Sequence, residues 1–430
     1  MSAILLGFAG LFGLILLRVP IGFAMALTGF LGVASLIGWW PAFSMVQQVT
    51  FDTGLAYELS VVPLFVLMGN FVTRAGLSDE LYAASYAWLG HRRGGLAMAT
   101  IVACGGFSAI CGSSLATAAT MARVAMPSMR RFGYADSLAA GSIAAGGTLG
   151  ILIPPSVILV LYGIMTGQDI GLLFAAGFLP GLLGVVCYLG AIAAVTRVNP
   201  DLGPRGESQR LAAKLAATGR VWGVLVLFVV VMGGIYAGVF TPTEAAGIGA
   251  FGGFLFALAR RTLTWRSLVA VLVQSAETTA MLFFVLIGAL LFANFVNLAG
   301  LPDMLSDLVS GLSAPPLLII AAILIIYLVL GCVLESLSMV LLTIPVFYPL
   351  VGDLGFDLIW FGIVVVVVTE ISLITPPVGL NVFVLKSVLP DVSTGQIFRG
   401  VTPFWLADIF RLALIVLIPM IALWLPGIIR

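Results

Sequence analysis

The sequence predicts an all-α polytopic membrane protein, built on an inverted repeat that contains two re-entrant helical hairpins and two broken transmembrane helices. Three observations predict this fold. Of 430 residues, 61% are hydrophobic and only 9% are charged, whereas about 25% of the residues of a soluble protein are charged. Many apolar stretches are long enough to cross the ~30 Å hydrocarbon layer. Short motifs recur in the two halves, and each half has a long apolar stretch interrupted by paired prolines.

The composition excludes several classes of function. Lys and Arg number 19 against 18 Asp and Glu, so no basic surface for nucleic acid is expected. One histidine, His91, and four cysteines in apolar stretches are too few for haem ligation, a zinc site or a disulfide framework. The N-terminus has neither a basic region nor a small-residue cleavage site, so we interpret it as a retained span.

Loop charges orient the apolar stretches. The polar loop 197–220 carries more basic than acidic residues, so the positive-inside rule places it in the cytoplasm. Arg260, Arg261 and Arg266 mark the same side two spans later. The expected spans are residues 3–17, 20–38, 56–72, 135–164, 169–196, 221–239, 244–259, 269–296, 358–389 and 404–428.

Two further apolar stretches return to the side from which they start. Residues 95–127 lie between basic segments, and each of their two legs reaches only ~24 Å, too short for a full crossing. They predict a cytoplasmic-side hairpin with its turn at 111–114. Residues 317–349 lie between acidic segments without Lys or Arg, which predicts a second hairpin on the outer face.

The two halves share residues at a spacing of about 222 positions. Flanking charges reverse between the copies, so the copies have opposite topology. Inverted repeats with broken helices are typical of secondary transporters. The paired motifs are Gly76-Leu77-Ser78-Asp79 with Gly300-Leu301-Pro302-Asp303, Met126-Pro127 with Ile344-Pro345, Gly133-Tyr134 with Gly355-Phe356, and Pro154-Pro155 with Pro376-Pro377.

The paired prolines mark where chemistry is expected. Neither the span containing 146–156 nor the span containing 370–381 can continue as one intact helix through its prolines. The freed carbonyls need a partner in a medium without water, and Na⁺ is such a partner. The helix N-termini beyond the breaks direct positive dipole ends inward, where an anion can bind.

This reasoning gives two candidate Na⁺ sites and a candidate substrate site. The alternative is that these small residues only allow close helix packing, but two symmetric copies beside two hairpins favour a site. The first Na⁺ site comprises Gly112, Ser113, Ser114, Gly150, Ile153 and Pro155, and the second comprises Gly331, Ser372, Thr375 and Val378, near the turn at Glu335 and Ser336. The substrate candidates are Ser113, Ser114, Thr375 and Asn381, the last expected to face the same cavity as Val378.

The first hairpin sequence GGFSAICGSSLATAATMARVAMPSMRRFGYAD, followed by GGTLGILIPPS, resembles the large membrane subunit of TRAP (tripartite ATP-independent periplasmic) transporters, the DctM-like family. EISLITPPVGLNVFVL and RVPIGFA extend the resemblance over nearly the whole chain. Two residues depart from the usual pattern: Ser372 stands where Gly is usual, and Glu335 where a shorter acidic residue is usual.

The resemblance implies a Na⁺-driven importer of organic acid anions that works by an elevator motion in the bacterial inner membrane, with no cofactor besides the coupling ion. It also implies two partners, a small four-helix DctQ-like membrane subunit and a periplasmic DctP-like substrate-binding protein. The implied organisation is scaffold at 1–75 and 221–299, a first repeat at 76–196, a cytoplasmic loop at 197–220 and a second repeat at 300–430.

Amphipathic segments near 79–90 and 302–312 are expected to lie in the membrane interface as arms between the scaffold and a moving domain. Arg123 either attracts a carboxylate substrate or snorkels or pairs with an acid. Glu370 either relays a proton or tunes the ion site, or is a paired structural carboxylate. Glu277, Asp408 and Arg411 are interpreted as interfacial or helix-pairing charges near span ends.

Three rival functions fit the sequence less well. An intramembrane serine protease would need His91 as its base, but His91 precedes the hairpin turn by ~30 Å of helix. A carrier of the same architecture that works without a binding protein is the closer rival. An ion channel would need a charged ring or a repeated filter, and the sequence shows neither.

Overall fold

The computed structural model describes residues 2–311 and 314–429, and within these ranges the regular structure is entirely helical, which confirms the all-α prediction. The first half contains α1 (Ser2–Leu16), α2 (Ile21–Ile37), α3 (Trp39–Leu55), η1 (Tyr57–Ser60), α4 (Val61–Arg74), α5 (Leu77–Leu89), α6 (Gly95–Cys111), α7 (Ser114–Arg131), α8 (Asp136–Thr148), η2 (Leu149–Ile151), α9 (Val157–Thr166), α10 (Ile170–Val198) and η3 (Pro200–Leu202). The second half contains α11 (Leu211–Arg220), α12 (Trp222–Tyr236), α13 (Pro242–Ala259), α14 (Trp265–Leu298), α15 (Leu301–Gly311), α16 (Pro316–Gly331), α17 (Ser336–Asp353), α18 (Leu358–Ser372), α19 (Leu380–Val388), α20 (Thr394–Leu417) and α21 (Met420–Ile429).

The helix bounds reproduce the two hairpins and the two breaks. Helices α6 and α7 meet at Gly112 and Ser113, and α16 and α17 meet at residues 332–335. The first long apolar stretch divides into α8, η2 and α9, and the second divides into α18 and α19. Among the described residues, α10, α13, α14, α17 and α20 are each long and apolar enough to be a candidate span, and two bent helix pairs raise the number to as many as seven.

Three segments differ from the expectation. Helix α3 was not predicted as a span because its apolar run contains polar residues such as Gln47 and Asp52; it forms with η1 and α4 a pair bent by 56°. Helix α11 lies inside the polar loop 197–220. The C-terminal stretch is two helices, α20 and α21, because Pro419 follows the end of α20 and cannot donate a backbone hydrogen bond.

The repeated motifs occupy equivalent turns. Gly76 and Gly300 precede α5 and α15 with φ values of +74° and +72°. Gly133 and Gly355 precede α8 and α18 with φ values of +74° and +79°. Only glycine adopts this left-handed conformation readily. The glycines of the repeated motifs are therefore explained by the same turn in both halves.

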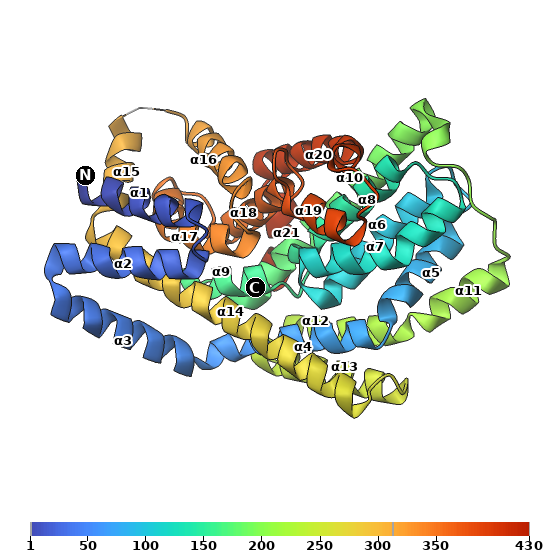
Figure 1. Ribbon diagram of the computed structural model, residues 1–430, viewed down its shortest axis with the longest axis horizontal. Coiled ribbons are helices and arrows are strands. Elements are labelled where there is room, and N and C mark those ends of the chain that lie inside the picture. The colour runs from blue at the N-terminus through green and yellow to red at the C-terminus, as the bar shows by residue number, and fades with distance from the viewer. Residues whose placement is uncertain (1, 312–313, 430) are drawn as a thin grey trace.

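The helices pack in two groups that Figure 1 shows on opposite sides of the molecule. In the first group, α14 packs along α2, α4 packs along α13, and α12 packs on α13. In the second group, α8 packs against α6, α7 and α20, while α18 packs against α10, α16 and α17. Contacts of α4 with α6 and of α14 with α17 connect the groups at the hairpins.

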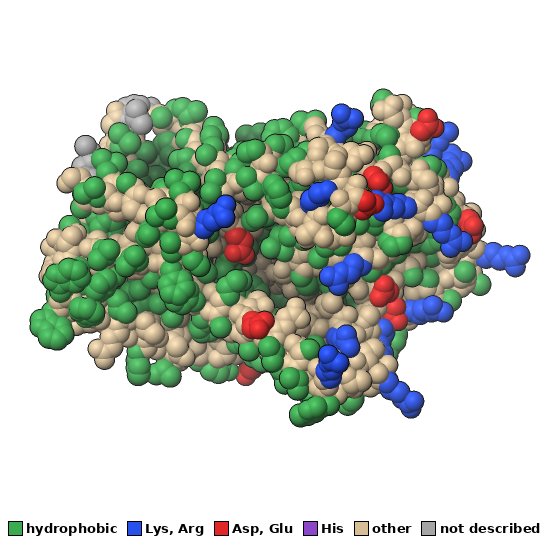
Figure 2. Space-filling view, in the orientation of Figure 1, with side chains coloured by type: hydrophobic (Ala, Val, Ile, Leu, Met, Phe, Trp, Pro, Cys, Tyr) green, Lys and Arg blue, Asp and Glu red, His purple; other side chains and the backbone are tan. Residues whose placement is uncertain are grey.

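Charged side chains are concentrated at one end of the molecule. In Figure 2, most Lys, Arg, Asp and Glu side chains gather over the end where α5, α11 and α13 lie, while the end with α1, α2 and α15 is largely hydrophobic. The loop 197–220, predicted to be cytoplasmic, lies at the charged end. This distribution agrees with the orientation derived from the positive-inside rule.

A buried ion network connects four helices of the second group. Arg411 of α20 contacts both Glu370 of α18 and Asp408, and all three side chains are 0% exposed. The hydroxyl of Tyr188 on α10 donates to Asp408 and lies 3.1 Å from the hydroxyl of Thr148 on α8. Gly184 makes room for this network, because a Cβ atom there would lie 2.1 Å from Nη1 of Arg411.

This network supports the paired alternative for these charges. Glu370 is a paired carboxylate, and Asp408 and Arg411 do pair helices. Their expected location near span ends was wrong, because both lie inside α20 and are fully buried; the sequence alone did not show that α20 begins as early as Thr394. Glu277 lies within α14 with an exposed side chain.

An ion pair at the charged end provides a contrast. Arg130 at the end of α7 pairs with Asp136 and with Asp391, and its side chain is 37% exposed. The hydrogen bond from Arg130 holds the pKa of Asp391 below its ordinary value. Solvent screens exposed pairs of this kind, so they contribute little to stability, whereas removing one partner of a buried pair costs about 3–5 kcal/mol.

We therefore expect Arg411→Met to lower the melting temperature of the purified protein strongly, because it leaves two buried carboxylates without a counter-charge. Arg130→Met is the matched control and should lower it only slightly. Thermal unfolding in detergent measures both. If the two variants melt at the same temperature, the buried network does not hold these helices together.

Candidate substrate and ion site at the hairpin tips

The tips of both hairpins line one cavity of about 220 Å³. Residues Gly112 to Ala116 come from the first tip, and Glu335 to Leu337 come from the second tip. Helices α4 and α14 close the opposite side, and Ile151, Val157 and Ile158 come from the first break and α9. The cavity therefore lies where the two groups of helices meet and where both repeats contribute a broken backbone segment.

In the first repeat the hairpin tip packs directly on the break. A Cβ atom on Gly150 would lie 2.9–3.0 Å from the backbone of Ser113 and Ser114, and one on Gly112 would lie 3.2 Å from the carbonyl oxygen of Pro155. The structure thus brings together five of the six residues predicted for the first Na⁺ site. Gly112, with φ of +63°, turns the chain, and Ser113 caps α7 by accepting a hydrogen bond from Ala116 N.

The sixth residue, Ile153, points its side chain away from the tip. It packs on Gly181 of α10, where a Cβ atom would lie 2.6 Å from Ile153 Cγ1. Only its carbonyl remains a candidate ligand. In the part of the chain that the structure describes, no hydrogen bond reaches the carbonyl oxygens of Ile153 or Pro155, as expected where prolines remove backbone donors.

The second repeat has a corresponding close contact, in which the glycine meets a serine side chain and not the backbone of the facing segment. A Cβ atom on Gly331, at the end of α16, would lie 2.1 Å from Oγ of Ser372. In the first repeat the glycine is on the broken helix and the serine is on the hairpin; here the glycine is on the hairpin and the serine is on the broken helix. The absence of a side chain at Gly331 thus leaves room for Ser372.

The other predicted residues of the second site lie apart from the cavity. The hydroxyl of Thr375 donates to Ile371 O and accepts from Trp405 Nε1. Val378 is half-buried beside Gly379. None of the predicted residues of the second break lines the cavity of the hairpin tips.

Asn381, predicted as a substrate residue, does not line the cavity of the hairpin tips. It is fully buried in α19, and its Nδ2 donates to Ala144 O of α8 at 3.1 Å. It therefore makes a hydrogen bond between helices of the two repeats. The amide faces α8 because α19 packs against α7 and α8.

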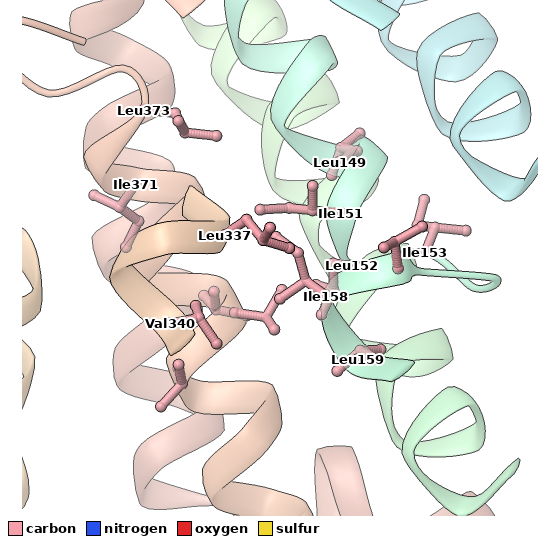
Figure 3. Close-up of a cluster of buried hydrophobic side chains, with 14 of the residues drawn as sticks. Leu149, Ile151, Leu152, Ile153, Ile158, Leu159, Leu337, Val340, Ile371 and Leu373 are labelled. Carbon is pink, nitrogen blue, oxygen red and sulfur yellow. The ribbon is translucent and has the colours of Figure 1, made fainter. Parts of the chain in front are cut away.

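The floor of the cavity is hydrophobic. Figure 3 shows side chains of the first break and α9, among them Ile151 and Ile158, pointing toward Leu337 of α17. Leu337 and Ile158 are 4% exposed, so they contribute a packed surface between the repeats. The polar groups of the cavity are consequently confined to the tips and to α4 and α14.

The sequence interpretation missed the polar residues that α4 and α14 supply. Asn70, Gln274 and Thr278 line the cavity, and Asn70 Nδ2 donates to Ser275 Oγ at 2.8 Å. The available signal was a pair of polar residues one turn apart, Gln274 and Thr278, inside a long apolar helix. Glu335, predicted to lie in the turn near the second ion site, lines this common cavity.

Comparisons with known proteins identify the family. The model of the "Tripartite ATP-independent periplasmic transporter, DctM component" matches residues 8–421. The "C4-dicarboxylate TRAP transporter large permease protein DctM" of Pseudomonas aeruginosa is 38% identical over 380 residues, which cover 88% of both chains. The "2,3-diketo-L-gulonate TRAP transporter large permease protein YiaN" of Escherichia coli is 32% identical, and the match covers 97% of both chains.

A solved structure supports the fold. The Alcanivorax borkumensis YdaH transporter aligns with a TM-score of 0.64 over 88% of both chains at 14% identity. The chain is thus an inner-membrane transport protein and not an enzyme, so the protease reading is wrong. From its sequence and its fold, this chain belongs to the DctM family, the large permease component of TRAP transporters.

Proposed function

We propose that this permease imports an organic acid anion together with Na⁺ by moving the second group of helices against the first. The observation that supports this proposal best is the single cavity between the two hairpin tips, which α4 and α14 close on one side. Residues of both groups thus line one small chamber. Na⁺ coupling and the elevator motion are both part of the proposal.

The oxygen atoms at the tip support a Na⁺ site in the first repeat. Hard cations prefer carbonyl, hydroxyl and carboxylate oxygens. The carbonyls of Ile153 and Pro155 have no hydrogen-bond donor among the described residues, and the backbone of Ser113 lies against Gly150. A bound Na⁺ would give these oxygens the partner that the bilayer does not provide.

The same chamber suits a small carboxylate. Helices α7 and α17 both begin at it, with Ser113 as the N-cap of α7 and Glu335 as the N-cap of α17. Helix N-termini attract anions through unpaired N–H groups. Because Glu335 adds a negative charge, we propose that it faces bound Na⁺ and that Ser113 and Ser114 face the substrate. Thr375 and Asn381 do not line this chamber, so they are not part of the proposed substrate site.

The packing supports the division into fixed and moving parts. We propose that α2, α4 and α12–α14 form the scaffold and that α6–α10 with α16–α21 carry the substrate. Helices α5 and α15 connect the parts. The cargo part is held together by the buried Arg411 network, and α5 is fastened to the scaffold by the ion pair of Glu80 with Arg260 at 2.7 Å.

We further propose the two partners that the family name implies, a small membrane subunit and a periplasmic binding protein. The test is uptake into proteoliposomes that contain this chain with its small subunit. Radiolabelled succinate and a keto sugar acid are supplied with or without an inward Na⁺ gradient and with or without the binding protein. Uptake should require both Na⁺ and the binding protein. Uptake independent of Na⁺ would refute the coupling, and Na⁺-driven uptake without the binding protein would instead indicate a carrier that works alone.

The exchanged contact in the second repeat gives a sharper prediction. Gly331→Ser should raise the Na⁺ concentration for half-maximal uptake by about fivefold or more, since a side chain there meets Ser372 and displaces the tip; loss of ~1 kcal/mol corresponds to about fivefold. Gly331→Ser with Ser372→Gly should restore uptake, because this pair reproduces the arrangement of the first repeat.

Gly190→Ser is the control, since nothing lies within 4 Å of a Cβ atom at that position on α10. The Na⁺ titration of each variant measures the effect. An unchanged titration for Gly331→Ser alone, or no recovery in the double variant, would contradict the role of this contact.

A further inference from the structure

A second cavity continues from the hairpin tips toward the charged end of the molecule. It has a volume of about 770 Å³. It shares Asn70, Cys111, Ala116 and Gln274 with the cavity at the tips. The two cavities therefore adjoin. Together they define a path from the hairpin tips, with α7 on one side and α4 and α14 on the other.

Three arginines line this second cavity. Arg74 ends α4, Arg123 lies on α7, and Arg266 is in the first turn of α14. The only acidic lining residue among those described is Asp79, so the wall carries an excess of positive charge. The other polar lining residues are uncharged, namely Asn70, Thr73, Thr120, Thr264, Ser267 and Gln274.

These guanidinium groups have no protein partner. Among residues 2–311 and 314–429, none of the three forms an ion pair or a side-chain hydrogen bond. Arg260, at the same end of the molecule, differs because it pairs with Glu80 and donates to Ala75 O. All three arginines are exposed, so they are accessible to a solute in this cavity, and a guanidinium group binds a carboxylate in a planar, bidentate way.

We propose that Arg74, Arg123 and Arg266 form a second anion site, which binds the carboxylate of the transported anion after it leaves the hairpin tips on the cytoplasmic side. This inference rests on the proposed function for the identity of the anion. The site joins the two groups of helices, because Arg123 belongs to the moving hairpin and Arg74 and Arg266 belong to the scaffold. Bound anion therefore favours the arrangement in which this path is open.

The site also gives the cytoplasm a means to slow import. An anion that accumulates inside the cell occupies the arginines and holds Arg123 against the scaffold. A ligand that prefers one conformation shifts the population toward it by its difference in affinity. Arg123, whose role the sequence left open, is thus assigned to the substrate path.

The binding test needs no transport. The complex of this chain with its small subunit is placed in nanodiscs of phosphatidylcholine, and phenylglyoxal modification of individual arginines is followed by mass spectrometry with and without succinate. Succinate should slow the modification of Arg74, Arg123 and Arg266 severalfold. It should leave Arg131 unchanged, an exposed arginine on α7 that does not line the cavity.

Equal modification of the three arginines with and without succinate would overturn the inference. A second set of nanodiscs contains phosphatidylglycerol. If this lipid alone protects the three arginines and succinate adds no protection, the site binds a lipid headgroup and the inference is overturned as well. Because no Na⁺ gradient is involved, failure of Na⁺-driven uptake and failure of this binding test are separate results.

A functional test uses Arg123→Gln, with Arg131→Gln as the matched control and Arg123→Lys to retain the charge. In proteoliposomes loaded with succinate, the internal concentration that half-inhibits net uptake should rise about tenfold in Arg123→Gln and stay unchanged in Arg131→Gln. Arg123→Lys should recover part of the effect. Inhibition by internal succinate that is the same in Arg123→Gln and wild type would refute the regulatory part of the proposal.

Discussion

The structure depends on one constraint, the absence of water for backbone groups that the bilayer surrounds. Paired prolines after Ile153 and after Thr375 break two helices, and broken backbone is tolerated in a membrane only where protein, water or an ion satisfies it. The two hairpins place a second broken segment beside the breaks. Gly150 in one repeat and Gly331 in the other allow this approach, because a side chain at either position would collide with its neighbour. Close packing and the proposed ion binding thus have the same cause.

A second constraint is that each of the two groups of helices beside the cavity must keep its own internal packing. The first break is received by α10, where Gly177 and Gly181 leave room for Leu152 and Ile153. The network of Arg411 fixes α10, α18 and α20 next to it. Such internal stiffness would let the tips move as one unit with their cargo, since packed interiors shift between discrete arrangements and do not deform continuously.

Most of the architecture could be predicted from the sequence because it follows from strong local rules. Proline pairs, glycine motifs at a constant offset and charge asymmetry of loops each depend on few residues. The sequence could not place Asn381 or Thr375, whose side chains point to α8 and to Trp405, because helix rotation depends on packing partners far away in the chain. For the same reason it missed Asn70 and Gln274, which face the cavity only because α4 and α14 lie beside the hairpins.

The measurement that tests relative motion most directly uses the contact of α4 with the first hairpin. A Cβ atom on Gly69 would lie 3.3 Å from Cα of Cys111, so Gly69→Cys places a second thiol beside the native Cys111, where oxidation tests for a cross-link. With the other three cysteines replaced by serine, oxidation should abolish Na⁺-driven uptake and reduction should restore it. Gly69→Cys with Cys111→Ser should be insensitive to oxidation. Full uptake by the completely cross-linked protein would contradict the account, because the hairpin would then carry its cargo without moving against α4.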